Sequence, residues 1–300
     1  MESMIDAINK RVSVRSYADR PIENDKKQEI INLLQSTERC PFGNKVRFTL
    51  IDFSEMDKEE IRNLGTYGFI SGAKFFIVSA IKDDVGVFMD LGYCFEKVIL
   101  KATNLDLGTC WMGGTFKRAN FAERINISED EIVPAISPVG YARDRRTIRE
   151  IAVRRFANAN QRKPWEELFF DGDLNTPLSQ DSAGLYAVPL ECVRIGPSAS
   201  NNQPWRVISQ KQPRAFHFYL KRTKGYDKFN AKIDLQLVDI GIAMCHFELS
   251  AREKGLSGIW EVVKPELDMG NTEYIVTWKE SRPLDQKLSV QGPLVNPTNV

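Results

Sequence analysis

The spacing of apolar and polar residues along the chain predicts helices and strands in both of its halves. The clearest helix spans residues 90–104, and a second strong helix spans residues 239–253. In the first of these, apolar side chains recur at intervals of three and four residues and form one continuous stripe. Shorter helices are predicted over residues 4–10, 23–36, 57–64 and near 183–194.

Strands are indicated where apolar residues alternate with polar ones or form a short unbroken run. Residues 46–52 alternate, whereas residues 74–81 are almost entirely apolar, as in a strand that is buried on both faces. Polar turn-forming residues at 171–182 indicate a connection between the halves. The remaining predicted strands span residues 135–142, 205–209, 215–221 and 273–278.

The two long helices belong to an internal repeat. Asp90 aligns with Asp239 and Trp111 with Trp260, each pair 149 residues apart without a gap. This fixed register favours a true duplication over a chance match between two amphipathic helices. The matched pairs between these ends are Gly92 and Gly241, Leu100 and Leu249, Ala102 and Ala251, and Leu107 and Leu256. A duplication of this size predicts that each half replaces one subunit of a two-fold dimer.

The segments before these helices correspond less completely. Residues 34–48 align with residues 190–207, but the first copy is three residues shorter, and residues 11–17 have no counterpart before the second half. This asymmetry predicts one functional site per chain. We expect a first half over 1–175, a second half over 176–285 and a loosely held tail over 286–300.

Composition and charge narrow the class of protein. The chain has 300 residues, with 41 Lys and Arg against 40 Asp and Glu, and a net charge of +1. Such a balance does not favour nucleic acid or an anionic membrane as a partner. No apolar run reaches a membrane-spanning length, and the N-terminus lacks the apolar region of a secretory signal. We therefore expect a cytoplasmic globular protein.

The cysteines and histidines offer little for metal or nucleophilic chemistry. Five cysteines at wide spacings, without a CxxC pair, predict reduced and mostly buried thiols. The two histidines, His217 and His246, lie in no Cys/His pattern, so no metal site is expected. They also offer little to a Ser-His-Asp site, and the sequence has neither a GxSxG elbow nor a GxGxxG turn after a strand.

The first motif with chemical potential comprises Arg11, Ser13 and Arg15. Alternate residues of an extended segment point the same way, so two guanidinium groups and a hydroxyl would face one ligand. This set suits a phosphate and a planar ring that forms hydrogen bonds. Taken alone, the segment also fits a solvated basic turn.

Three further motifs have both a functional and a structural interpretation. The loop GPSASNNQPW at residues 196–205 concentrates short polar side chains, and it also fits a capped turn between a helix and a strand. Gly113 and Gly114 would let the backbone approach a flat ring, but the Lys of a P-loop is missing. Arg162 and Lys163 fit either a phosphate clamp or a solvated pair. They end a basic run at 143–163, which lacks the aromatic residues of a nucleic-acid site.

Together these motifs resemble the FMN-dependent nitroreductase family. The similarity rests on RVSVRSY at 11–17, the polar loop at 196–205, the D-x-G helix leading to Gly113 and Gly114, and RKPWEELF at 162–169. The polar loop normally follows the first motif closely, whereas here it lies in the second half. This order is similar to that of the tandem subfamily. The resemblance implies an α+β fold with central mixed sheets flanked by helices, in which the two halves form an intramolecular pseudo-dimer.

The resemblance also implies which residues bind FMN. Arg11 and Ser13 would hold the phosphate or ribityl chain, and Arg15 would lie near the pyrimidine edge of the flavin. The residues after Gly196 would reach the ring from the opposite half. The full set expected to bind the cofactor is Arg11, Val12, Ser13, Arg15, Gly113, Gly114, Arg162, Lys163, Pro197, Ser198, Ala199 and Asn201.

The activity implied by the resemblance is hydride transfer from NAD(P)H through FMN to nitroaromatic or quinone-like acceptors, by a ping-pong mechanism. The flavin carries the redox chemistry, so no catalytic side chain is expected. A monomer would suffice, and the altered loop at 40–45 makes a second FMN doubtful. Two alternatives are a flavin-binding protein without turnover and a specialised or dehalogenating flavin oxidoreductase of the same fold.

Overall fold

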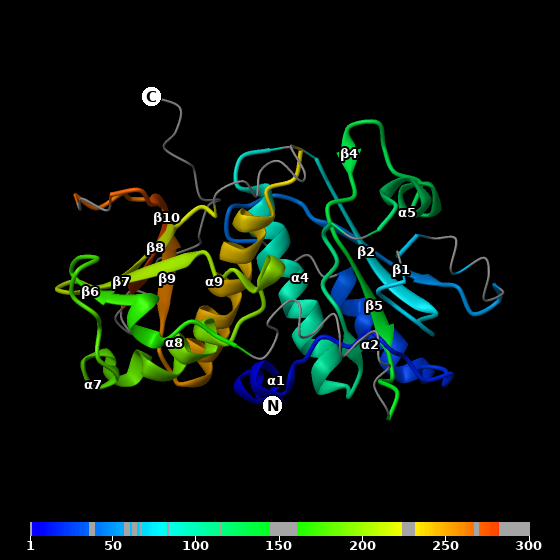
Figure 1. Ribbon diagram of the computed structural model, residues 1–300, viewed down its shortest axis with the longest axis horizontal. Helices are drawn as coiled ribbons and strands as arrows, with labels where there is room; N and C mark the ends of the chain where they lie inside the picture. The colour runs from blue at the N-terminus through cyan, green and yellow to red at the C-terminus, as the bar shows by residue number, and fades with distance from the viewer. Residues whose placement is uncertain are drawn as a thin grey trace.

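The computed structural model describes residues 2–35, 40–56, 61, 65, 66, 68–82, 84–114, 116–144, 161–223, 232–266 and 270–281. Two β-sheets lie on either side of a pair of long helices, and the first sheet is formed from the N-terminal half (Figure 1). Its strands, in spatial order, are β1 (Arg47–Asp52), β2 (Phe75–Lys82), β5 (Ile136–Gly140) and β3 (Gly108–Thr109), and β4 (Glu131–Ile132) pairs with the end of β2.

The second sheet repeats the strand order of the first. Strands β7, β8, β10 and β9 are neighbours in that order and are all antiparallel, as β1, β2, β5 and β3 are. An additional strand, β6, pairs in parallel with β7. The bounds are β6 (Phe169–Asp171), β7 (Trp205–Lys211), β8 (Arg214–Leu220), β9 (Gly258–Glu261) and β10 (Glu273–Glu280). This shared topology is what the repeat in the sequence predicts.

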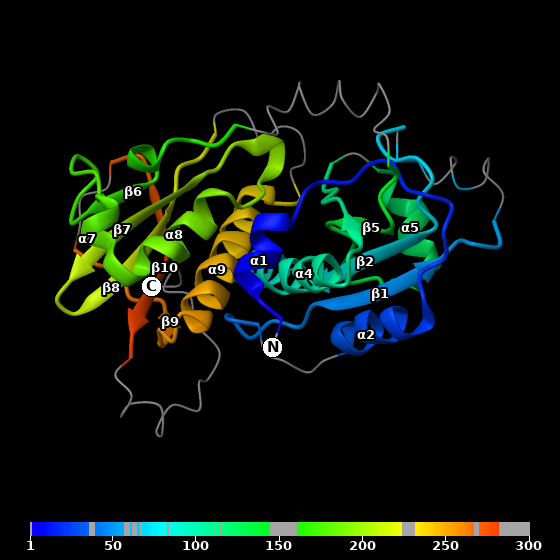
Figure 2. The same ribbon diagram turned by 90° about the horizontal axis from the view of Figure 1, so that it is seen from below.

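The helices α4 (Val87–Asn104) and α9 (Leu235–Glu253) cross each other between the two sheets (Figures 1 and 2). Asp234 begins α9 by accepting hydrogen bonds from the backbone N–H groups of Gln236 and Leu237. The left-handed Gly86 precedes α4. The remaining helices are α1 (Met4–Lys10), α2 (Asn24–Leu34), α5 (Arg118–Arg124), α7 (Gln180–Ala183), α8 (Ala187–Arg194) and the short η1 (Trp165–Glu167), η2 (Gly184–Tyr186) and η3 (Ala199–Asn201).

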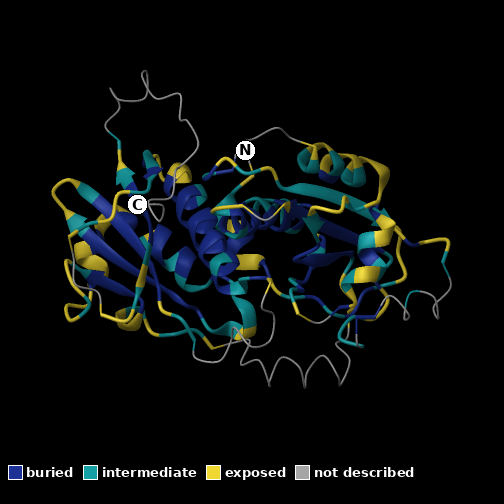
Figure 3. Ribbon diagram, turned by 90° about the horizontal axis from the view of Figure 1, so that it is seen from above, coloured by how far each residue is buried: buried dark blue, intermediate teal, exposed yellow. Residues whose placement is uncertain are grey.

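Each long helix contributes to the core of both halves. Val238 and Ile242 of α9 pack in the core around the first sheet, while Met89 and Leu100 of α4 pack in the core around the second. Both helices are therefore buried along most of their length (Figure 3). The N-terminal helix α1 packs against both α4 and α9, and its Ala7 joins the second core. The two halves thus share their cores at this helix crossing.

Most predicted elements are confirmed with shifted ends. The main misses are β3, β4, β6, β9 and α5, of which several are too short to show periodicity. The predicted helix at 57–64 lies mostly outside the described residues, as do the tail at 286–300 and most of the basic run at 143–163. The division at residue 175 stays a prediction, but β6, which precedes it, already belongs to the second sheet.

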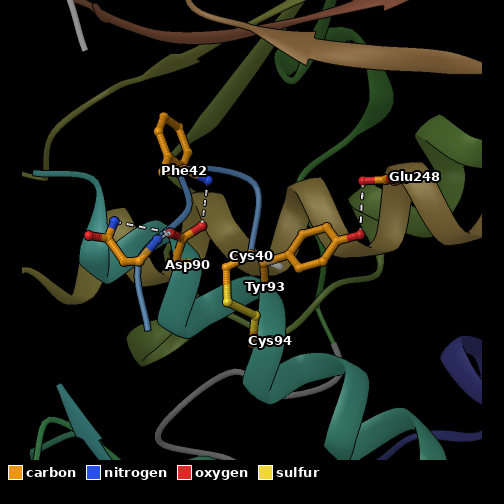
Figure 4. The surroundings of a disulfide bond; sticks show 7 residues. Cys40, Phe42, Asp90, Tyr93, Cys94 and Glu248 are labelled. Atoms are coloured by element: carbon orange, nitrogen blue, oxygen red, sulfur yellow. Dashed lines mark hydrogen bonds between the residues drawn. A yellow bond between two sulfur atoms is a disulfide. The ribbon is translucent and has the colours of Figure 1, made fainter. Parts of the chain in front are cut away.

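The expectation of reduced thiols is wrong for two of the five cysteines. Cys40 and Cys94 form a disulfide, whereas Cys110, Cys192 and Cys245 lie outside any disulfide and are buried as predicted. The pairing arises because Asp90 holds the loop that follows Cys40 against the first turn of α4, four residues before Cys94 (Figure 4). Wide sequence spacing gave no sign of this contact.

Within the described residues, no helix combines the length and the apolar character needed to cross a membrane. The same residues contain no cluster of three or more His, Cys, Asp or Glu side chains that could hold a metal ion.

Candidate functional site

The segment at 11–17 runs alongside the edge of the first sheet in an extended form. Ser13 pairs with Thr109 of β3, and the backbone N–H of Val14 donates to the carbonyl of Thr109 at 2.8 Å. The hydroxyl of Tyr17 returns to donate to the carbonyl of Val14 at 2.8 Å. The predicted extended conformation is therefore present, and the sheet edge fixes its register.

The side chains of this segment have different surroundings. Arg11 is buried and lies beside Glu96 of α4, with its Nε 3.8 Å from Oε1 of the carboxylate. Arg15 buries its Nη1 atom, and this atom has no hydrogen-bond partner among the residues that the structure describes. Val12 is 46% exposed. A buried guanidinium N–H without an acceptor is costly, so Arg15 indicates a position for a ligand.

The polar loop of the second half, residues 197–204, is held to α9 and to itself. The backbone N–H of Ala199 donates to Oδ1 of Asp239 at 2.9 Å, and the N–H of Gln203 donates to Oγ of Ser198 at 2.9 Å. Three of its residues, Ser200, Asn201 and Gln203, have positive φ angles. Such conformations cost free energy for residues with a Cβ, and they persist where the surrounding contacts impose them.

Arg162 and Lys163 contact this loop. Nη1 of Arg162 donates to Oδ1 of Asn201 at 3.0 Å, and its Nε donates to the carbonyl of Ile195 at 3.2 Å. The backbone N–H of Lys163 donates to Oε1 of Gln203 at 2.6 Å. Burial and the nearby charge of Arg206 lower the pKa of Lys163. Two cations therefore lie directly against the loop.

Gly113 lies at the same end of α9 as the loop. A Cβ on Gly113 would come within 2.6 Å of the Leu235 side chain, which is one helical turn before Asp239. The Gly113 carbonyl accepts a hydrogen bond from Nη2 of Arg118. The neighbouring Gly114 has open space where a side chain would begin. The first-half glycines and the second-half loop are thus both placed around the first turns of α9.

Glu96 and His246 connect Arg11 to the start of the loop. His246 of α9 lies 2.9 Å from Glu96 through Nε2 and 2.8 Å from the Cys192 carbonyl through Nδ1. A Cβ on Gly196 would lie 3.4 Å from the same Nδ1. Arg11 and Gly196 therefore flank one buried pair. From the sequence, His246 was interpreted as an ordinary structural residue, and its contact with Glu96 is visible only in the fold.

The aligned aspartates of the repeat, Asp90 and Asp239, each accept hydrogen bonds from the backbone of a loop in their own half. Asp90 accepts hydrogen bonds from the backbone N–H groups of Phe42 and Asn44 at 2.8 and 2.9 Å (Figure 4), as Asp239 does from Ala199. The second carboxylate oxygen of Asp239 has no hydrogen-bond partner in the described part of the chain, and burial raises the pKa of this residue well above its ordinary value. Asp90 and Asp239 align without a gap in the internal repeat, and this alignment was the sequence signal that could have identified them as the residues that bind these loops.

Comparisons with known proteins place the chain in a family. Residues 3–251 match the model of the family described as "Putative TM nitroreductase". The comparison with curated proteins found no match. A crystal structure of a protein from Thermotoga maritima, titled a putative nitroreductase, has 19% sequence identity and a TM-score of 0.57, with 93% of each chain covered. This match shows the shared fold.

Two other solved structures match about half of the chain and are too distant to support an argument. An FMN-dependent nitroreductase from Clostridium difficile is 21% identical, covers 48% of this chain and 90% of its own, and has a TM-score of 0.40. A nitroreductase family protein from Clostridium novyi is 23% identical, covers 48% and 87%, and has a TM-score of 0.40. On the match over residues 3–251, the chain belongs to the TM-type nitroreductase family, with a nitroreductase-like fold and the general oxidoreductase role that this membership supports.

Proposed function

We propose that the protein is an FMN-dependent oxidoreductase that uses NAD(P)H to reduce nitroaromatic or quinone-like acceptors. The observation that carries the proposal is the buried Nη1 of Arg15, for which the described residues supply no hydrogen-bond acceptor. It belongs to the extended segment at 11–17 that the family resemblance assigns to the cofactor. A hydrogen-bond acceptor on a flavin edge would satisfy it.

The charged side chains and the hydrogen-bond donors of the candidate site suit the phosphate and the ring of FMN. Arg162 and Lys163 supply positive charge at the polar loop, which suits the phosphate. Gly114, five residues after β3, has open space among the described residues, where a flat ring could approach the backbone. The expected cofactor set is Arg11, Val12, Ser13, Arg15, Gly113, Gly114, Arg162, Lys163, Pro197, Ser198, Ala199 and Asn201.

Hydride uptake from a reduced nicotinamide and its delivery to the acceptor, in alternating half-reactions, is the chemistry that FMN supplies when bound. The chain itself binds and orients. A cation at Arg15 favours added negative charge near the pyrimidine edge, and Asp239 keeps the loop at 197–204 against α9. No side chain of the chain needs to act as acid, base or nucleophile in this scheme.

The proposal includes one cofactor site per chain, with the halves in the place of two subunits. The first-half loop at 40–45 is shorter, and Asp90 and the Cys40–Cys94 disulfide hold it to α4. Arg47, the counterpart of Arg206, is neutralised by Glu131 at 2.7 Å. These contacts support the proposal that the corresponding position in the first half is closed to a second FMN. A monomer would then be sufficient, and a cytoplasmic location would provide the reduced nicotinamide.

The absorbance spectrum of the purified protein, before and after addition of FMN and gel filtration, tests the proposal. We expect a flavin band that corresponds to about one FMN per chain, and bleaching of that band by NADH or NADPH without oxygen. Acceptor-dependent oxidation of the nicotinamide then separates a nitro or quinone reductase from a specialised relative. Retained FMN without bleaching would support a binding protein that lacks turnover. A protein that stays colourless after reconstitution would refute the proposal.

A further inference from the structure

A buried polar cluster joins the two halves at the crossing of α4 and α9. At its centre, Glu96 of α4 and His246 of α9 are both 0% exposed. Oε1 of Glu96 lies 2.9 Å from Nε2 of His246 and 3.8 Å from Nε of Arg11. Its other oxygen, Oε2, accepts a hydrogen bond from the indole N–H of Trp111 at 2.6 Å. The cluster therefore contains one acid, one arginine and one histidine away from water.

The hydrogen-bond partners determine the protonation state of His246. Its Nδ1 faces the backbone carbonyl of Cys192 at 2.8 Å, and a carbonyl can only accept, so Nδ1 carries a proton. Its Nε2 faces Oε1 of Glu96, which lies 3.8 Å from the Arg11 guanidinium, while Oε2 accepts the indole N–H of Trp111. A carboxylate beside a guanidinium can only accept, so as a carboxylate Glu96 needs a donor at Nε2. Nε2 therefore also carries a proton.

We propose that Glu96 and His246 form a buried carboxylate–imidazolium pair that positions Arg11 and the start of the 196–204 loop for an anionic ligand. One carboxylate faces two cations, so the cluster keeps a net positive charge. The backbone on each side leads into the proposed cofactor site, through Arg11 to Ser13 and through Gly196 to Ser198. Both residues are positioning residues, and the part of the proposal that concerns the ligand rests on the proposed function.

The other histidine of the chain provides an internal reference. His217 is buried in the second sheet, where Nε2 faces Oε1 of Gln210 at 2.9 Å and Nδ1 faces the hydroxyl of Thr277 at 2.8 Å. A hydroxyl can donate, so one ring proton satisfies both contacts. Burial lowers the pKa of His217 to about 4. The neutral form of His217 and the imidazolium form of His246 should therefore coexist.

The test of the pair is a nitrogen NMR spectrum of the protein labelled with ¹⁵N-histidine, recorded at about pH 8, where an ordinary histidine is neutral. Since the chain has two histidines, His217→Gln and His246→Gln assign the signals. We expect one neutral ring, His217, and one ring with protons on both nitrogens, His246. A neutral His246 would overturn the proposal, and two neutral rings in the unsubstituted protein would show this without any variant.

The test of positioning compares Glu96→Gln with Glu248→Gln. Glu248 is also buried at the helix crossing and also accepts from an indole, that of Trp260 at 2.6 Å, but its cross-helix partner is the hydroxyl of Tyr93. We expect Glu96→Gln to convert His246 to the neutral ring and to weaken FMN binding about tenfold or more. Glu248→Gln should leave the His246 signal and FMN affinity within about twofold of the unsubstituted protein.

The outcomes separate this inference from the proposed function. Equal losses of FMN in the two variants would overturn the positioning role, because a general loosening of the helix crossing would then explain both. If the unsubstituted protein takes up no FMN while His246 carries both protons, the proposed function fails and the ion pair stands. Inorganic phosphate then serves as the anionic probe, and perturbation of the His246 signal in the unsubstituted protein but not in Glu96→Gln would support the positioning role. An unperturbed signal would overturn it.

Discussion

Gly92 of α4 and Gly241 of α9 meet where the two helices cross, and neither position has room for a side chain. A Cβ on Gly92 would lie 2.1 Å from the Val238 carbonyl oxygen, and one on Gly241 would lie 2.0 Å from the Met89 carbonyl oxygen. The two glycines are counterparts in the repeat, so the contact is the same from either helix. At this crossing, the backbones of the two helices are therefore in direct contact.

Gly92→Ala should destabilise the protein because the added methyl group must separate two packed helices. We expect a loss of about 3 kcal/mol in the free energy of unfolding, at the upper end of the usual cost of overpacking. Urea denaturation measures this loss. Gly114→Ala is the matched control, since a Cβ there meets nothing within 4 Å. Equal stability of the two variants would contradict the close helix crossing.

Arg15→Ala should weaken FMN binding, because it removes the guanidinium whose buried Nη1 lacks an acceptor. The loss of one charge-assisted hydrogen bond corresponds to about a tenfold to hundredfold rise in the dissociation constant. Fluorescence titration with FMN measures this change. Arg143→Ala, at an exposed position, serves as the control. Unchanged affinity in Arg15→Ala would remove the proposed role of this residue.

Asp90 should make stability depend on pH in the acidic range. Burial raises its pKa from 3.8 to about 6, and hydrogen bonds from Phe42 and Asn44 offset this only in part. The folded protein thus binds the proton more tightly than the unfolded chain. Its contribution is complete below about pH 4 and is lost as pH rises toward 6, by up to about 3 kcal/mol.

Asp90→Asn should therefore flatten the decline in stability between about pH 4 and pH 6. Denaturation curves at several pH values, compared with those of the unsubstituted protein, measure the difference. Asp181→Asn, which changes an exposed carboxylate on α7, is the control and should keep the original slope. A stability that rises through this range because of Asp90 would contradict the raised pKa.

Asp239→Asn should be tolerated, whereas Asp239→Ala should loosen the loop at 197–204. Burial raises the pKa of Asp239 and so favours its neutral form, and an amide of the same shape preserves the acceptor for the Ala199 N–H. We expect less than about 1 kcal/mol of destabilisation for the amide and about 1–3 kcal/mol for alanine, which leaves that N–H unpaired. Thermal unfolding, together with FMN titration, distinguishes the two. Equal effects would refute the tether.

The Cys40–Cys94 disulfide should stabilise the protein by about 2–4 kcal/mol, because it closes a loop whose ends are 54 residues apart. A reducing agent should lower the unfolding temperature of the unsubstituted protein and leave that of Cys94→Ser unchanged. Peptide mapping without reduction identifies the bond directly. Five reactive thiols in the denatured, unreduced protein would show that the bond does not form. This count matters because disulfides are rare in the cytoplasm.

The sequence alone determined the long helices, the main strands and the repeat. Asp90, Gly92 and their counterparts Asp239 and Gly241 stand in one ungapped register, and the structure gives each pair one role. Periodicity over a long segment reports a buried face directly, so α4 was predictable, and the repeat aligns α9 with it. The family resemblance assigned Arg162, Lys163 and the polar loop to one cofactor, and this assignment stays a prediction.

Only the tertiary structure decided which residues meet across the halves. Two-residue strands such as β3 carry no periodic signal, and the disulfide depends on how Asp90 folds the preceding loop. The pairing of Glu96 with His246 joins positions 150 residues apart, and one histidine in an apolar helix looks the same whether its partner is an acid or a carbonyl. Local pattern determines which face of an element is buried, but the crossing of α4 and α9 determines what that face contacts.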